Sequence, residues 1–203
     1  MADETQETAL RKVKACEVVL DGTPPPPIVG LDSVMQVARD VQLERQHPEL
    51  FQGALAARTG TSMLLFGPPG CGKTMVATTV AHVLGAYSLF RVSASTLTGM
   101  FYGQAEAAVA ALFHEATERA TARKRLVVIF LDELDALMGT RGGAKEDGSD
   151  RKLLTQTLTS MNALHRDVLV VGATNRPQDI DAAVRRRFPF RLHVPLPSAA
   201  VRT

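Results

Sequence analysis

The stretch that decides the fold is MLLFGPPGCGKT, residues 63–74. It begins with a short apolar run, Met63–Phe66, which is typical of a buried strand. The part that follows, Gly67–Thr74, fits the pattern G-x-x-x-x-G-K-[ST]. After this loop, apolar side chains recur on one face of a helix that Gly85 would end. The sequence therefore predicts a strand, a glycine-rich loop and a helix in succession.

Each residue type in this loop suits the binding of phosphate groups. Glycines let successive backbone N–H groups turn around phosphate oxygens, because no Cβ stands in the way. The Lys73 ammonium would reach the β- and γ-phosphates of a nucleotide, and the Thr74 hydroxyl would bind Mg²⁺. The alternative is a glycine loop with an incidental lysine, but the flanking strand and helix favour phosphate binding. The predicted binding residues are Pro68, Pro69, Gly70, Cys71, Gly72, Lys73 and Thr74.

Strand-like and helical patterns alternate along the rest of the chain. Further strand-like runs lie at 89–92, 126–131, 168–171 and 191–194. Helical patterns start at Gln104 and again before Leu154. Run 126–131 is apolar on both faces, as expected at the centre of a parallel sheet, and 191–194 is expected at an edge. This alternation indicates βαβ units, so the predicted class is α/β, with a five-stranded parallel sheet between helices.

Two acidic residues, Asp132 and Glu133, directly follow the predicted central strand. The carboxyl ends of parallel strands face the crevice where ligands of open α/β sheets bind. Asp132 would hold Mg²⁺ through water, and Glu133 would polarise a water that attacks the phosphate. Two acids after a strand are by themselves more often a helix N-cap. Their combination with the phosphate loop favours catalysis.

Two polar signals further along the chain have competing interpretations. Asn175 follows a predicted strand, where its amide could orient the attacking water or could merely start a turn before Pro177. Arg185–Arg187 could be a solvated or phosphate-binding patch. It could also supply an arginine finger, a guanidinium that neutralises charge developing on a neighbouring subunit's γ-phosphate. Neither choice is settled by these residues alone.

Composition excludes several classes of protein. The chain has 203 residues, the size of one domain, and a net charge of +2, which argues against a protein that coats nucleic acid. Its longest apolar run is far shorter than the ~20 residues of a membrane span. Two cysteines and scattered histidines provide neither a disulfide framework nor zinc-ligand spacing. We expect a cytoplasmic protein with no membrane span and no nucleic-acid partner.

The N-terminal segment differs in composition from the rest. Residues 1–27 are polar and charged and end in four consecutive prolines, so a leader with a stiff linker is predicted there. A segment packed on the surface of the domain and a docking peptide for a partner are both compatible with this composition. The predicted domain is therefore 28–203.

Four motifs occur in family-like order and spacing: GPPGCGKT, LDELDAL, GATNRP and RRRF. Together they resemble the AAA ATPases, over about residues 28–203. Met138–Gly142 and Val184–Phe188 look most like the vacuolar protein sorting ATPase that disassembles ESCRT filaments. His47–Phe51 is similar to the whole meiotic clade, which includes katanin, spastin and fidgetin. The resemblance implies a P-loop NTPase fold, ATP and Mg²⁺ as cofactors, a homo-hexamer or a ring with related subunits, and a protein substrate threaded through a central pore.

The resemblance also implies roles for single residues. Asp132 and Glu133 would be the hydrolysis pair, and Asn175 the first sensor of the γ-phosphate. Arg186 and Arg187 would be the fingers that reach the neighbouring subunit's ATP.

Two further segments correspond to family binding regions. Val29 and Gly30 match the segment whose backbone meets the adenine. Phe101 matches the aromatic position of the substrate-gripping pore loop, next to Tyr102, although a core aromatic is equally compatible with the sequence. Four positions depart from the family pattern: Pro27 replaces an Asp, Gln104–Ala105 replaces Glu-Ser, and Cys71 replaces Thr or Asn.

The resemblance leads to one main functional hypothesis and two alternatives. The main hypothesis is a Mg-ATP-hydrolysing module that remodels a protein complex, most like ESCRT disassembly, in the cytoplasm and at the periphery of endosomal membranes. The helical lid of the family is not encoded within these 203 residues. A lidless ATP-binding regulatory subunit with little hydrolysis is therefore one alternative. A microtubule-severing ATPase is the other.

Overall fold

The architecture was obtained from a computed structural model of the chain. The structure describes residues 2–20, 22, 24, 28, 30–50, 62–93, 96–97, 104–138 and 148–196. Among the helices in these ranges, none is both long and apolar enough to cross a membrane.

A six-stranded sheet forms the centre of the fold, with strand order β1-β3-β4-β5-β2-β6. The strands are β1 (Glu17–Val19), β2 (Ser62–Phe66), β3 (Ser88–Ser93), β4 (Val127–Asp132), β5 (Val168–Thr174) and β6 (Phe190–His193). Every neighbouring pair is parallel except β1 and β3. All five predicted strands are present and mutually parallel, with β6 at an edge, so the predicted α/β class is confirmed. Strand β5 is buried along its whole length, and β4 is buried except at its last residue. Both apolar strands therefore lie inside the sheet, where helices cover the two faces.

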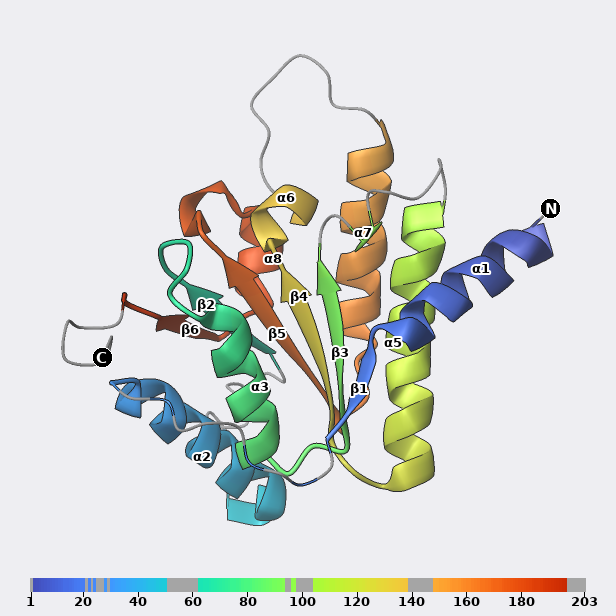
Figure 1. Cartoon of the computed structure of the whole chain (residues 1–203). Coiled ribbons are helices and arrows are strands. Elements are labelled where there is room, and N and C mark those ends of the chain that lie inside the picture. Colours follow the sequence, from blue (N-terminus) through green and yellow to red (C-terminus); the bar gives the residue numbers. More distant parts are fainter. Residues whose placement is uncertain are drawn as a thin grey trace.

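Helices cover both faces of this sheet (Figure 1). The helices are α1 (Ala2–Ala15), α2 (Asp32–Gln46), α3 (Lys73–Val83), α5 (Gln104–Arg123), α6 (Leu134–Met138), α7 (Gly148–Asn162) and α8 (Ala182–Arg186). Short 3-10 turns lie at Pro48–Leu50 and Pro177–Asp179. Side chains of β4 alternate between the faces: Ile129 belongs to the core that includes residues of α1, α5 and α7, and Val128 to the core that includes residues of α2 and α3. The sheet is thus the middle of three layers, each face with its own core.

The N-terminal segment extends the domain beyond its predicted start at residue 28. Residues 2–20 are part of the fold rather than a separate leader, because α1 buries Ala9 and Val13 in the same core as α5. Strand β1 then pairs antiparallel with β3, with Glu17 opposite Phe90, and becomes a sixth strand that the sequence did not predict. The described part of this segment packs on the domain, which is one of the arrangements that its composition allows.

An ionic cluster links β1 to α5. The Nε of Arg119 lies 3.2 Å from a carboxylate oxygen of Glu17, and its Nη2 lies 3.0 Å from a carboxylate oxygen of Glu115. Burial by itself would lower the pKa of Arg119, but the hydrogen bond and charge of Glu17, together with Glu115, raise it above its ordinary value. Glu115 is buried and one oxygen of Glu17 is buried without a hydrogen-bond partner. Arg119 therefore compensates two carboxylates that have little access to water.

Replacing Arg119 by methionine should lower the free energy of unfolding by about 1–2 kcal/mol, since both carboxylates lose their cation. Urea unfolding at neutral pH measures this change. Arg11→Met on the exposed surface of α1 is the control and should have little effect. Equal small changes in the two variants would mean that the cluster does not stabilise the attachment of β1.

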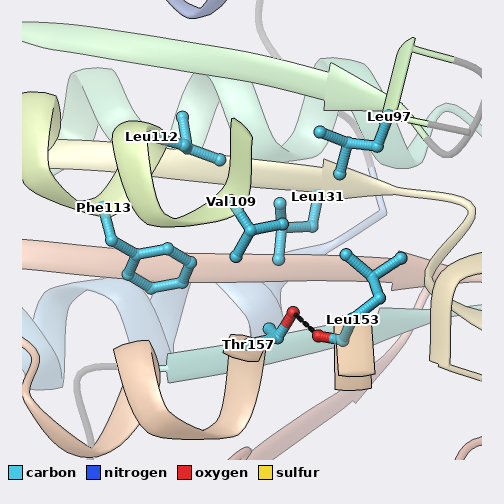
Figure 2. Close-up of a pocket in the computed structure, with 7 residues that line it drawn as sticks. All are labelled: Leu97, Val109, Leu112, Phe113, Leu131, Leu153 and Thr157. Atoms are coloured by element: carbon cyan, nitrogen blue, oxygen red, sulfur yellow. Dashed lines mark hydrogen bonds between the residues drawn. The ribbon is translucent and has the colours of Figure 1, made fainter. Parts of the chain in front are cut away.

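The seam between α5, α7 and β4 is apolar. Figure 2 shows the side chains that converge there: Leu97, Val109, Leu112, Phe113, Leu131, Leu153 and Thr157. The Thr157 hydroxyl donates a 2.9 Å hydrogen bond to the Leu153 carbonyl, so it is satisfied within its own helix. The remaining gap is too narrow to hold a water molecule. It is therefore packing that fixes α7 to the sheet, with no free polar group for a ligand.

Candidate functional site

The glycine-rich loop lies between β2 and α3, at the carboxyl end of the parallel strands. Gly72 is the N-cap of α3 and has a left-handed backbone, with φ of +86°. A left-handed conformation strongly favours glycine. Gly72 offers no side chain to bond the free N–H groups of the first helical turn, and no side-chain cap bond is formed. Those N–H groups and the helix dipole make this turn suited to an anion.

Lys73, the first residue of α3, is a nearly buried cation, with 8% of its surface exposed. Its Nζ donates hydrogen bonds to the carbonyls of Gly67 and Pro68, both at 2.9 Å, and to Oδ1 of Asn175 at 2.7 Å. It also lies 3.5 Å from the Cys71 sulfur. All four acceptors are uncharged, so these contacts solvate the ammonium without neutralising it. An anionic ligand would be a stronger partner than any of them.

Two oxygen atoms from different elements meet beside this loop. The Thr74 hydroxyl on α3 donates a 3.1 Å hydrogen bond to Oδ2 of Asp132, the last residue of β4. The other oxygen of Asp132 accepts the backbone N–H of Glu133 at 2.9 Å. Glu133 has φ of +54°, which costs a residue with a Cβ on the order of 1 kcal/mol. This strained turn directs the chain out of β4 and leaves the Glu133 side chain exposed at the edge of the sheet.

The end of β5 completes the cluster. Asn175 directly follows β5, and its Oδ1 accepts the hydrogen bond from Lys73, so its side chain lies in this cluster. Beside it, the Thr174 hydroxyl donates a 2.6 Å hydrogen bond to Asp135 and accepts one from the backbone N–H of Arg176 at 2.9 Å. This Thr174–Asp135 link was not predicted. Its only sequence signal was the third acid of the LDELDAL run, Asp135.

The arginines of α8 lie apart from this cluster. Arg186 is exposed, and Arg187, the C-cap of α8, donates from Nε to Oδ1 of Asn162 at 2.8 Å. Within the described residues neither arginine makes a hydrogen bond or ion pair with the glycine-rich loop or with Asp132. A role toward a site on another subunit is compatible with this position.

Not every predicted site residue lies in the described ranges. Gly30 is described and has φ of +78°. Val29, Phe101 and Tyr102 lie outside the described residues, so their roles stay predictions. In the described ranges, no group of three or more His, Cys, Asp or Glu side chains could hold a metal ion by itself.

A parallel α/β sheet with a glycine-rich loop, a buried lysine and an acid after the central strand defines a P-loop NTPase, a class that binds nucleoside phosphates. The chain belongs to the AAA family. Residues 63–196 match the model of the "ATPase family associated with various cellular activities (AAA)". This agrees with the family resemblance of the four motifs.

Curated relatives come from several branches of the family. The chain is 43% identical over 158 residues to the AAA domain-containing protein FIGL1 of Arabidopsis thaliana, covering 76% of the chain and 22% of that protein. It is 39% identical to Protein SUPPRESSOR OF K(+) TRANSPORT GROWTH DEFECT 1 of Arabidopsis thaliana, covering 86% and 39%. It is 42% identical to spastin of Danio rerio, covering 86% and 30%. The chain thus spans well under half the length of these relatives, and their similar identities do not single out the vacuolar sorting type.

Solved structures agree with the fold. A crystal structure of the FIGL-1 AAA domain in complex with ADP has a TM-score of 0.78 and 34% identity, covering 97% of this chain and 64% of that one. A katanin structure determined for its self-assembly has a TM-score of 0.75 and 30% identity, covering 96% and 61%. Both structures support the AAA fold of this chain, and the FIGL-1 domain is the one that holds ADP.

Proposed function

We propose that the chain is an ATP-hydrolysing AAA module that uses the energy of hydrolysis to remodel a protein complex. The observation that supports this best is the convergence of Lys73, Thr74, Asp132 and Asn175 from α3, β4 and the end of β5. Lys73 would exchange its uncharged acceptors for β- and γ-phosphate oxygens. The N–H groups at the start of α3 would bind the same phosphates.

Thr74 and Asp132 fit a magnesium ion held jointly with the phosphates. Mg²⁺ prefers oxygen ligands and is commonly bound through one or two carboxylates plus substrate phosphates. The Thr74 and Asp132 oxygens lie 3.1 Å apart, so Thr74 would bind the ion directly and Asp132 would hold it through a water molecule. The ion would supply charge neutralisation at the phosphates. Glu133 would accept a proton from the attacking water, and Asn175 would orient that water.

Assembly would complete the site. Arg186 and Arg187 would reach the γ-phosphate bound by a neighbouring copy in a hexameric ring, since they contact no part of their own phosphate loop in the described residues. Phe101 and Tyr102 would grip a protein segment in the pore. The motifs Met138–Gly142 and Val184–Phe188 favour ESCRT filaments at the periphery of endosomal membranes as the assembly that is remodelled.

Steady-state ATP turnover across a series of protein concentrations tests this proposal. Turnover per chain should rise steeply with concentration, because a site completed by a neighbour needs assembly. Glu133→Gln should lower turnover by about 100-fold, since it removes the base but keeps the size of the side chain. It should leave ATP affinity nearly unchanged.

The matched control is Glu118→Gln on α5, which makes the same chemical change at an exposed position and should leave turnover unchanged. Tight ATP binding with turnover that Glu133→Gln does not alter would contradict hydrolysis at this site. It would instead favour an ATP-binding regulatory subunit.

A further inference from the structure

Asn162 and Arg187 form a contact between two helix ends. Asn162 is the last residue of α7, and Arg187 is the C-cap of α8. Oδ1 of Asn162 accepts a 2.8 Å hydrogen bond from Nε of Arg187, across 25 residues of chain. Asn162 is exposed and Arg187 is half-buried, so the contact lies at the surface and contributes little to the core.

The backbone of Arg187 is already held by its own segment. The Asp181 side chain caps α8 by accepting the Ala183 N–H at 2.7 Å, while Val184 and Phe188 are almost completely buried. Without a further contact the long arginine side chain would rotate freely, and ordering it costs conformational entropy. A bond at Nε fixes the plane of the guanidinium close to its root. The contact therefore acts on the direction of the side chain rather than on the fold.

The hydrogen bond leaves the outer end of the guanidinium available. An arginine has five N–H donors in a fixed planar fork, and the contact with Asn162 uses only the Nε–H. Within the described residues, the two Nη groups of Arg187 make no hydrogen bond. Four N–H donors therefore remain in a planar fork, the arrangement that binds phosphate oxygens in pairs.

The acceptor is an amide, and this affects the charge of the group it holds. Arg119 and Arg45 bind carboxylates, Arg119 to Glu17 and Glu115 and Arg45 to Asp167, which neutralise them. Asn162 orients Arg187 without neutralising it. Full positive charge is the property that a group needs to stabilise negative charge on a transferring phosphoryl group.

We propose that Asn162 is a positioning residue that aims the Arg187 guanidinium at the nucleotide of a neighbouring copy and preserves its charge. This rests on the proposed function, in which Arg187 acts on that nucleotide. Asn162 itself touches no phosphate. It acts by restricting the orientations of the Arg187 side chain beforehand, so that less conformational entropy is lost when the site assembles.

Two substitutions of Asn162 separate this role from a structural one. Asn162→Ala should lower kcat by about 10-fold with little change in KM, because the orientation of Arg187 is lost. Asn162→Asp should also lower kcat, since a carboxylate still holds the guanidinium but neutralises it. Thermal stability should change little in either variant, because the site is exposed. Alanine has a higher helix propensity than asparagine, and the unfavourable charge of aspartate at a helix C-terminus is offset by its ion pair with Arg187. Thr159→Ala, an exposed position one turn earlier, is the control and should keep wild-type turnover.

The outcomes are distinct. If Asn162→Asp kept the wild-type kcat with its ion pair to Arg187 intact, neutralising the guanidinium would have no effect on turnover. The contact would then be only structural, and the proposal would be overturned. A 10-fold loss from Asn162→Ala that persists in an Arg187→Ala background, where the proposal expects no further loss, would also overturn it.

Mixed assemblies locate the defect. Asn162→Ala subunits keep a complete phosphate site, while Glu133→Gln subunits keep an intact Asn162–Arg187 pair. A mixture of the two should turn over faster than the average of the separate variants, because each supplies what its neighbour lacks. Turnover equal to that average would overturn action on a neighbour. A wild-type protein without concentration-dependent turnover would instead contradict the proposed function.

Discussion

Lys73→Met is expected to weaken ATP binding by about 1,000-fold. The substitution keeps the length of the side chain but removes the only group of the loop that carries a full positive charge toward the phosphates. In the structure this ammonium is nearly buried and bonded only to uncharged acceptors. Two hydrogen bonds to charged phosphate oxygens at about 2 kcal/mol each amount to about 4 kcal/mol. Equilibrium titration with Mg-ATP in a Glu133→Gln background measures the loss without consuming the ligand.

The control for this charge removal is Lys14→Met on α1, which is exposed and remote from the loop. It should bind ATP like the parent protein. Thermal unfolding without nucleotide should show Lys73→Met still folded, since β2 and α3 keep their packing. An affinity within 10-fold of the parent would mean that the backbone N–H groups alone hold the phosphates, and that the role assigned to Lys73 is wrong.

The sequence was most informative where a pattern is local and dense. The run at 126–131 is apolar at every position, and only a strand buried on both faces needs that, so β4 could be predicted. The glycine-rich loop could be predicted for a similar reason, because its residue types at fixed spacing have few other uses. Both are properties of a single short segment.

The N-terminal segment shows where such patterns fail. Among the α1 side chains whose burial the structure describes, Ala9 and Val13 are the buried ones, with mostly polar neighbours, and β1 is three residues long. Neither gives a periodic signal strong enough to outweigh a polar, proline-ended composition. The segment is held by contacts between residues far apart in the sequence: Ala9 and Val13 pack in the core with α5, β1 pairs with β3, and Glu17 binds Arg119, 102 positions away. A contact of this separation cannot be derived from one chain's local pattern.

The candidate site lies between these two cases. Its members could be named because each ends a predicted strand or begins a predicted helix, and parallel strands bring those ends to one edge. The contacts themselves, such as Lys73 to Asn175 and Thr174 to Asp135, depend on side-chain geometry. For the same reason Asn162 was not predicted, since nothing in its own segment marks it. Its relevance follows only from the 2.8 Å bond to Arg187.

Gly67→Ala tests the steric basis of the phosphate loop. Gly67 follows β2, where its N–H donates to the Thr174 carbonyl at 3.3 Å. A Cβ added at Gly67 would lie 2.1 Å from the backbone oxygen of Val194, a contact that no rotamer can relieve. The next residue back, Phe66, accepts the Val194 N–H at 2.8 Å, so the extra methyl would force β6 away from β2. The free energy of unfolding should fall by about 3 kcal/mol, as measured by urea denaturation.

Gly85→Ala is the matched control for this prediction. Gly85 has φ of +66° and no atom within 4 Å of an added Cβ, so alanine there suffers backbone strain without a collision. It should cost only about 1 kcal/mol. Gly67→Ala should also weaken ATP binding in the fraction that remains folded, because the Gly67 carbonyl is one of the acceptors that hold Lys73. If the two variants were equally stable, β6 would have to move freely from β2, and the glycine at 67 would not be needed for the close approach of the loop to Val194.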